Sequence, residues 1–108
     1  SWYMQHAEKR LNEKVGRFAQ VIGVAPKSVK VKNYKSRWGS CSTSGDISFH
    51  WAIIMAPHYI VDYVVVHELC HMHHHNHSPA FWQRVEKVLP NYRDCRDWLK
   101  HHGQELKI

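Results

Sequence analysis

The first 22 residues carry apolar side chains at helical spacing. Apolar residues recur there every three or four positions, at Ala7, Leu11, Val15, Phe18 and Ile22. This is the period of one face of an α-helix. The pattern predicts a helix over residues 2–22, which Gly23 and Pro26 would end.

Alternating apolar and polar residues then predict a small sheet. Val29 and Val31 alternate with lysines, as a half-buried strand requires. Residues 37–41 and 47–51 have the composition of two further strands, and the segment between them, residues 42–46, is rich in turn-forming residues. We therefore expect about three strands, the last two forming a hairpin.

The middle of the chain does not reveal its secondary structure by periodicity. Pro57 suits the first turn of a helix, whereas the run of valines at residues 64–66 fits a strand equally well. Further on, Ser78 and Pro79 are typical of a helix N-terminus, and Pro90 would end that helix. A last helix over residues 92–101 would bury Trp98 and Leu99, with Gly103 closing it.

Composition favours one globular domain. The chain has 108 residues, of which 44% are hydrophobic, enough for one modest core. Its net charge of +6 is compatible with an acidic partner such as nucleic acid, but the charges are scattered and do not indicate one. Neither a signal peptide nor a membrane span is visible. Three cysteines without CxxC spacing favour a reducing, cytoplasmic setting.

Residues 67–71 read HExxH, the pattern that carries chemistry in this sequence. On a helix, His67 and His71 stand one turn apart on one face, so both imidazoles can bind one zinc ion. Glu68 lies beside them and is placed to take a proton from a water molecule that the metal activates. We therefore predict that the segment is a helix and that Glu68 is the general base.

The third metal ligand is less obvious. His74 lies about 10 Å of helical rise from His67, too far to share its ion. His77 follows Asn76, a residue that can end a helix and turn the chain back, so we select His77. Glu86 is the rival ligand, on the next helix. The spacing of the three histidines matches the metzincin pattern, except that His74 replaces its glycine and no methionine follows.

Several separated motifs together resemble the YgjP-like metallopeptidase family. They are Arg37-Trp38-Gly39-Ser40-Cys41, Val66-His67-Glu68-Leu69-Cys70-His71 and Asn76-His77-Ser78-Pro79 with Phe81-Trp82. The resemblance implies an α+β, zincin-like fold, related to the SprT-like proteases that act on DNA-associated proteins. It also implies His67, His71 and His77 as ligands and Glu68 as catalyst. Residues 1–108 would then be one domain, the C-terminal catalytic part of a longer protein.

The function expected from the sequence is zinc-dependent hydrolysis of peptide or other amide bonds. Arg37, Tyr92 and His101 are candidate donors to the oxyanion that develops on the substrate. Cys41 and Cys70 are expected to be small buried residues and not ligands. The alternative from another class is a zinc-stabilised interaction module without catalysis, associated with nucleic acid, which would need a closed set of four protein ligands. Imidazole ligands alone do not select zinc over other divalent ions.

Overall fold

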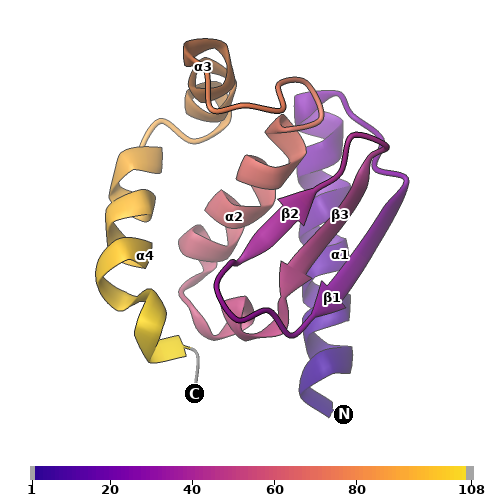
Figure 1. Ribbon diagram of the computed structural model, residues 1–108, viewed down its shortest axis with the longest axis vertical. Helices are drawn as coiled ribbons and strands as arrows, with labels where there is room; N and C mark the ends of the chain where they lie inside the picture. The colour runs from indigo at the N-terminus through magenta and orange to yellow at the C-terminus, as the bar shows by residue number, and fades with distance from the viewer. Residues whose placement is uncertain (1, 107–108) are drawn as a thin grey trace.

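The computed structural model describes residues 2–106 and has the expected α+β architecture. The chain runs through its elements in the order α1 (Trp2–Ile22), β1 (Ser28–Lys32), β2 (Gly39–Cys41), β3 (Asp46–His50), the 3-10 helix η1 (Trp51–Met55), α2 (His58–Cys70), α3 (Pro79–Val88) and α4 (Tyr92–Leu106). Figure 1 shows the sheet lying over α1 and α2, with α4 on the other side of α2 and α3 across its C-terminal end. Among residues 2–106, no helix is both long and apolar enough to cross a membrane.

The three strands form one sheet in the order β1-β3-β2. The predicted hairpin is confirmed, because β2 pairs antiparallel with β3, whereas β1 pairs parallel with β3. Ile47 and Phe49 of β3 are buried against the helices. The strand expected to reach residue 51 ends at His50, whose Nδ1 accepts a hydrogen bond from the Ala52 backbone N–H at 3.2 Å and starts η1 instead.

The ambiguous middle segment is the helix α2, and it is the most buried helix of residues 2–106. Nine of its thirteen residues are buried, at Ile60, Val61, Tyr63, Val64, Val65, Val66, Glu68, Leu69 and Cys70. It contacts α1, α3, α4, β2 and η1. A helix covered on every side must be apolar on every side, so it lacks the one-sided pattern that marks a surface helix. This explains why its periodicity was uninformative.

The last helix differs from its prediction at Gly103. The helix α4 continues through this residue to Leu106, so Gly103 does not end it. A Cβ at Gly103 would lie 3.4 Å from Nε1 of Trp38, in van der Waals contact, so this position packs against the Trp38 ring. Trp98 and Leu99 are only partly buried, while Tyr92 and Cys95 are buried. The start of α3 at Pro79 is as predicted, and Ser78 Oγ accepts the Phe81 backbone N–H at 3.3 Å.

The edge strand β2 approaches α2 closely at Gly39. A Cβ built on Gly39 would lie 2.9 Å from Cγ and 3.0 Å from Oε2 of Glu68, and 3.0 Å from the backbone oxygen of Ser48. Contacts this short are repulsive, so any larger residue would push the strand away from the helix or displace the Glu68 side chain. Glycine at this position therefore fixes how near the strand comes to the buried carboxylate.

We predict that Gly39→Ala lowers the free energy of unfolding by about 1–3 kcal/mol, because it overpacks a tight contact. The matched control is Gly16→Ala in the middle of α1, where a Cβ meets nothing within 4 Å. That variant should gain roughly 0.5–1 kcal/mol, since alanine is the better helix former. Urea denaturation measures both, and equal stability of the two variants would contradict the close contact at Gly39.

Candidate active site

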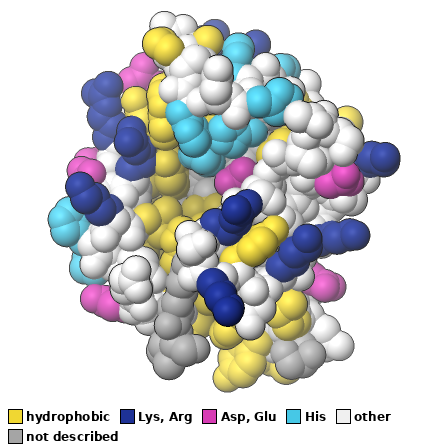
Figure 2. Space-filling view, viewed as in Figure 1, with side chains coloured by type: hydrophobic (Ala, Val, Ile, Leu, Met, Phe, Trp, Pro, Cys, Tyr) yellow, Lys and Arg dark blue, Asp and Glu magenta, His cyan; other side chains and the backbone are white. Residues whose placement is uncertain are grey.

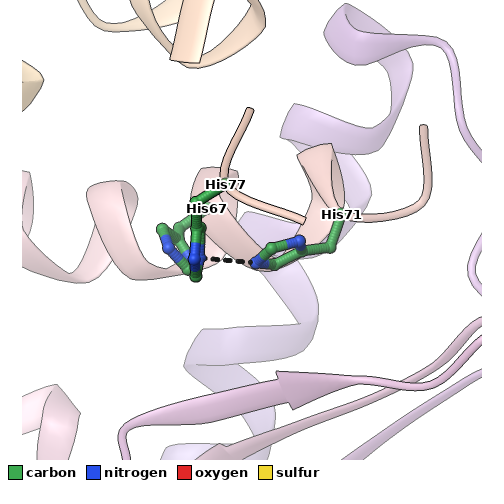
Figure 3. Close-up of side chains that lie close together, drawn as sticks. All are labelled: His67, His71 and His77. Carbon is green, nitrogen blue, oxygen red and sulfur yellow. Dashed lines mark hydrogen bonds between the residues drawn. The ribbon is translucent and has the colours of Figure 1, made fainter. Parts of the chain in front are cut away.

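Three histidines converge where α2 ends. His67 belongs to the last turns of α2, His71 is the residue that caps its C-terminus, and His77 lies in the connection to α3. One ring nitrogen from each falls within 4.8 Å of the others. Figure 3 shows His67 and His77 side by side, with the ring of His71 directed at them. His77 returns to the helix as expected, but the reason given for it was wrong. The helix α2 ends at Cys70, six residues before Asn76, and among residues 2–106 only glycines have a positive φ, so Asn76 does not end the helix.

A backbone hydrogen bond sets the tautomer of His71. Its Nδ1 lies 2.9 Å from the carbonyl oxygen of His74, and because a carbonyl can only accept, Nδ1–H is the donor. In the neutral ring, Nε2 then carries the lone pair, and it lies 3.1 Å from Nε2 of His77. Two nitrogens bound to one tetrahedral zinc ion lie about 3.3 Å apart, given Zn–N distances of 2.0–2.1 Å. The spacing therefore suits a shared metal ion.

Burial favours the neutral rings of His71 and His77, and aromatic side chains of α3 pack against both. Burial is the main cause that lowers the pKa of His71 below its ordinary value, and partial desolvation lowers the pKa of His77. The neutral ring is the form that binds a metal. From α3, Phe81 stacks on His71 with ring centroids 4.4 Å apart, and Trp82 stacks on His77 at 5.7 Å.

Glu68 lies beside the histidines and is almost fully buried, with 6% of its surface exposed. Its Oε2 is 3.3 Å from Nδ1 of His67. Gly39 of β2 bounds it on the other side, so the carboxylate is held between the sheet edge and α2. The residue predicted as general base therefore borders the histidine cluster.

A hollow of about 240 Å³ opens beside Glu68. It is lined by Trp38, Gly39, Tyr63, Val64, His67, Glu68 and Leu99. Its floor is α2, and its two walls are the start of β2 and α4. Figure 2 shows the histidines gathered above a hollow of hydrophobic side chains, with Lys and Arg side chains on both sides. The cluster thus faces a cleft that solvent can reach.

Tyr63 is a cleft residue that the sequence analysis did not select. It stands four residues before His67, on the same face of α2, and the two ring centroids lie 5.8 Å apart. Burial raises the pKa of its hydroxyl far above the ordinary range, and the nearby positive charge of Arg96 only partly opposes this. The hydroxyl therefore stays protonated and able to donate a hydrogen bond. Its spacing from His67 was the signal available in the sequence.

The rival ligands lie elsewhere. Glu86 is exposed on α3 and does not belong to the histidine cluster. Nε2 of His74 accepts a hydrogen bond from Arg84, at 3.0 Å. Cys70 is fully buried in the core, where burial raises its pKa to about 11, and Cys41 is partly buried.

The three candidate oxyanion donors do not line the hollow beside Glu68. The Arg37 guanidinium lies over the Tyr34 ring, 5.6 Å from its centroid. Tyr92 is buried and stacks on Trp82, with ring centroids 5.2 Å apart. The His101 Nδ1–H donates to the backbone oxygen of Asp97 at 2.8 Å. Of the tyrosines and cations considered, Tyr63 is the one that borders both His67 and Glu68.

Comparison with known proteins agrees with this arrangement. The crystal structure of the metallopeptidase zymogen of Pyrococcus abyssi abylysin superposes with a TM-score of 0.79, covering 87% of this chain and 95% of that one, at 23% sequence identity. That likeness shows the fold. A search of curated proteins gives no match. The sequence profile of the YgjP-like metallopeptidase domain matches residues 1–102. The chain therefore belongs to the YgjP-like metallopeptidase family.

Proposed function

We propose that this protein is a zinc-dependent peptide hydrolase, with His67, His71 and His77 holding the metal and Glu68 acting as general base. The observation that carries the proposal is the convergence of three imidazole nitrogens within 4.8 Å, beside a buried carboxylate at the edge of a cleft. Three neutral imidazoles form a donor set that suits zinc. Three protein ligands are also what catalytic zinc sites use, because one position stays open to the reactants.

Each residue then has a defined role. When bound, the metal supplies Lewis-acid polarisation of the scissile carbonyl and makes water more acidic. Glu68 accepts the proton of the attacking water and afterwards delivers it to the leaving amine. Tyr63 donates a hydrogen bond from its protonated hydroxyl to the oxygen that becomes negative in the transition state. The main chain of β2 at the sheet edge aligns an extended peptide.

The same three-histidine geometry disfavours the alternative, a zinc site that only stabilises the fold. Such a site closes its coordination with a fourth protein ligand. Within residues 2–106, the group that could hold the ion contains the three histidines and no further Cys, His, Asp or Glu. Glu68 is an immediate neighbour of the group but borders the cleft, where a general base is needed.

Removal of His77 should cost the protein its metal. We expect His77→Ala to lower the zinc affinity by more than about 100-fold. Mutation of residues that only hydrogen-bond to a metal ligand already lowers metal affinity by about 10- to 100-fold, and His77 would be a ligand itself. His75→Ala is the matched control, since His75 is exposed and outside the cluster. Competition against a chelator, followed by elemental analysis, measures both. Retention of full zinc affinity by His77→Ala would remove it as a ligand.

Replacement of Glu68 should stop hydrolysis without affecting the metal. Glu68→Gln keeps the size of the side chain but removes the proton acceptor, so we expect kcat to fall by about 100-fold or more. Zinc content and the circular dichroism spectrum should stay unchanged. Glu86→Gln makes the same change on exposed α3 and should have no effect on hydrolysis or on zinc content. Hydrolysis that survives Glu68→Gln would refute the mechanism, and zinc loss in Glu86→Gln would identify the rival ligand.

Tyr63→Phe should lower kcat by about 100-fold with little change in KM, because the hydroxyl acts on charge that develops only in the transition state. The ring, and with it the packing beside His67, is retained. Tyr59→Phe, one turn earlier on α2 and half-exposed, is the control and should leave kcat unchanged. Equal kcat values for the two variants would exclude Tyr63 as the donor.

A further inference from the structure

The cleft continues past the hollow beside Glu68 into a second one on the side of α4. This second hollow is lined by Trp38, Tyr63, Arg96, Asp97, Leu99 and Lys100. Trp38, Tyr63 and Leu99 border both hollows, so the two are adjacent. The first hollow is bounded mainly by aromatic and aliphatic side chains. The second is lined by two cations, Arg96 and Lys100, and by one carboxylate, that of Asp97. A peptide in the cleft therefore passes from an apolar site to a cationic one.

Arg96 is an exposed residue that lies over an aromatic ring at the border of this second hollow. Its Cζ lies 4.5 Å from the ring centroid of Trp82, and Trp82 in turn stacks on His77. A guanidinium can stack on an aromatic face and still use its N–H edge to bind a carboxylate in bidentate fashion. Among the ion pairs found within residues 2–106, none involves Arg96. The cation is thus positioned relative to the histidine cluster without being neutralised by an ion pair.

The first hollow has room for a large apolar side chain. A cavity of about 150 Å³ lined by aliphatic and aromatic groups is enough to bind benzene. The hollow beside Glu68 has a volume of about 240 Å³, with Val64 in its floor and Leu99 and Trp38 in its walls. A leucine or phenylalanine side chain of a substrate fits this space. Such a residue would place its own peptide bonds close to Glu68.

We propose that Arg96 is the residue that determines substrate specificity, and that the preferred substrates are peptides with a carboxylate flanking a large apolar residue at the scissile bond. The inference rests on the proposed peptidase function and names its substrate class. The carboxylate comes either from an Asp or Glu side chain or from the free C-terminus of a peptide. Lys100, on the next turn of α4, adds to the positive potential, but Arg96 is the cation that lies over the Trp82 ring.

The test uses the zinc-loaded protein and three matched fluorogenic peptides with phenylalanine at the centre. The Glu peptide has Glu on both sides of the phenylalanine and an amidated C-terminus. The Gln peptide is the same except that Gln replaces both Glu residues. The carboxylate-ended peptide also has Gln on both sides, but it ends with a free C-terminal carboxylate on the residue that follows phenylalanine. The Gln peptide is the reference. For the wild type, kcat/KM should be about tenfold higher than this reference with the Glu peptide, with the carboxylate-ended peptide, or with both. Which of these two peptides gains identifies the source of the carboxylate.

Variants on α4 assign the effect to one residue. Arg96→Gln should remove the preference, whereas Arg93→Gln should keep it, because Arg93 lies over Tyr92 and lines neither hollow. Arg96→Glu should reverse the preference towards a peptide with Lys in the flanking positions. Zinc content is measured for each variant and should equal that of the wild type.

The outcomes separate the two proposals. Equal cleavage of all three peptides by the wild type, or loss of the preference in Arg93→Gln but not in Arg96→Gln, would overturn the role of Arg96 and leave the peptidase function intact. Absence of cleavage of every peptide by fully zinc-loaded protein would overturn both.

Discussion

The burial of α2 is the constraint on which the structure depends. This helix is apolar around most of its circumference, so it is stable only when other elements cover most of its surface. The helices α1, α3 and α4, the 3-10 helix η1 and the strand β2 supply that cover. Cover is incomplete along one strip between β2 and α4, and there Tyr63, His67 and Glu68 face the cleft. A rigid, buried helix therefore presents its few polar side chains at one defined place.

Small residues and aromatic rings then adjust the distances. Gly39 lets the sheet edge approach Glu68 in the floor of the cleft, and Gly103 of α4 packs against Trp38, which joins the two walls. On the other side, Phe81 and Trp82 of α3 pack on the imidazoles of His71 and His77. Trp82 also supports Arg96, which connects the candidate metal centre with the cationic part of the cleft. The site is thus built from packing contacts made by four separate elements.

The sequence allowed the local features to be predicted, but not those that depend on distant contacts. The period of α1 and the cap at Ser78 arise from neighbouring residues, and both predictions are confirmed. The HExxH spacing is local in the same way and places the rings of His67 and His71 with centroids 4.9 Å apart. The helix over residues 58–70 could not be told from a strand, because its burial depends on five other elements. Gly103 was taken for a helix end, since the nearness of Trp38 is a tertiary contact. Tyr63 was missed although it stands four residues before His67 on the same helix face, because this spacing alone does not show that the face borders a cleft.

The central claim is that three histidines hold a catalytic zinc ion with one position left open, and X-ray absorption spectroscopy of the zinc-loaded protein tests it most directly. We predict one zinc per chain, with three imidazole nitrogens at about 2.0–2.1 Å and one exchangeable oxygen ligand. A shell of four protein ligands would contradict catalysis and point to a structural site. Failure to bind zinc at all would contradict the account of His67, His71 and His77 itself.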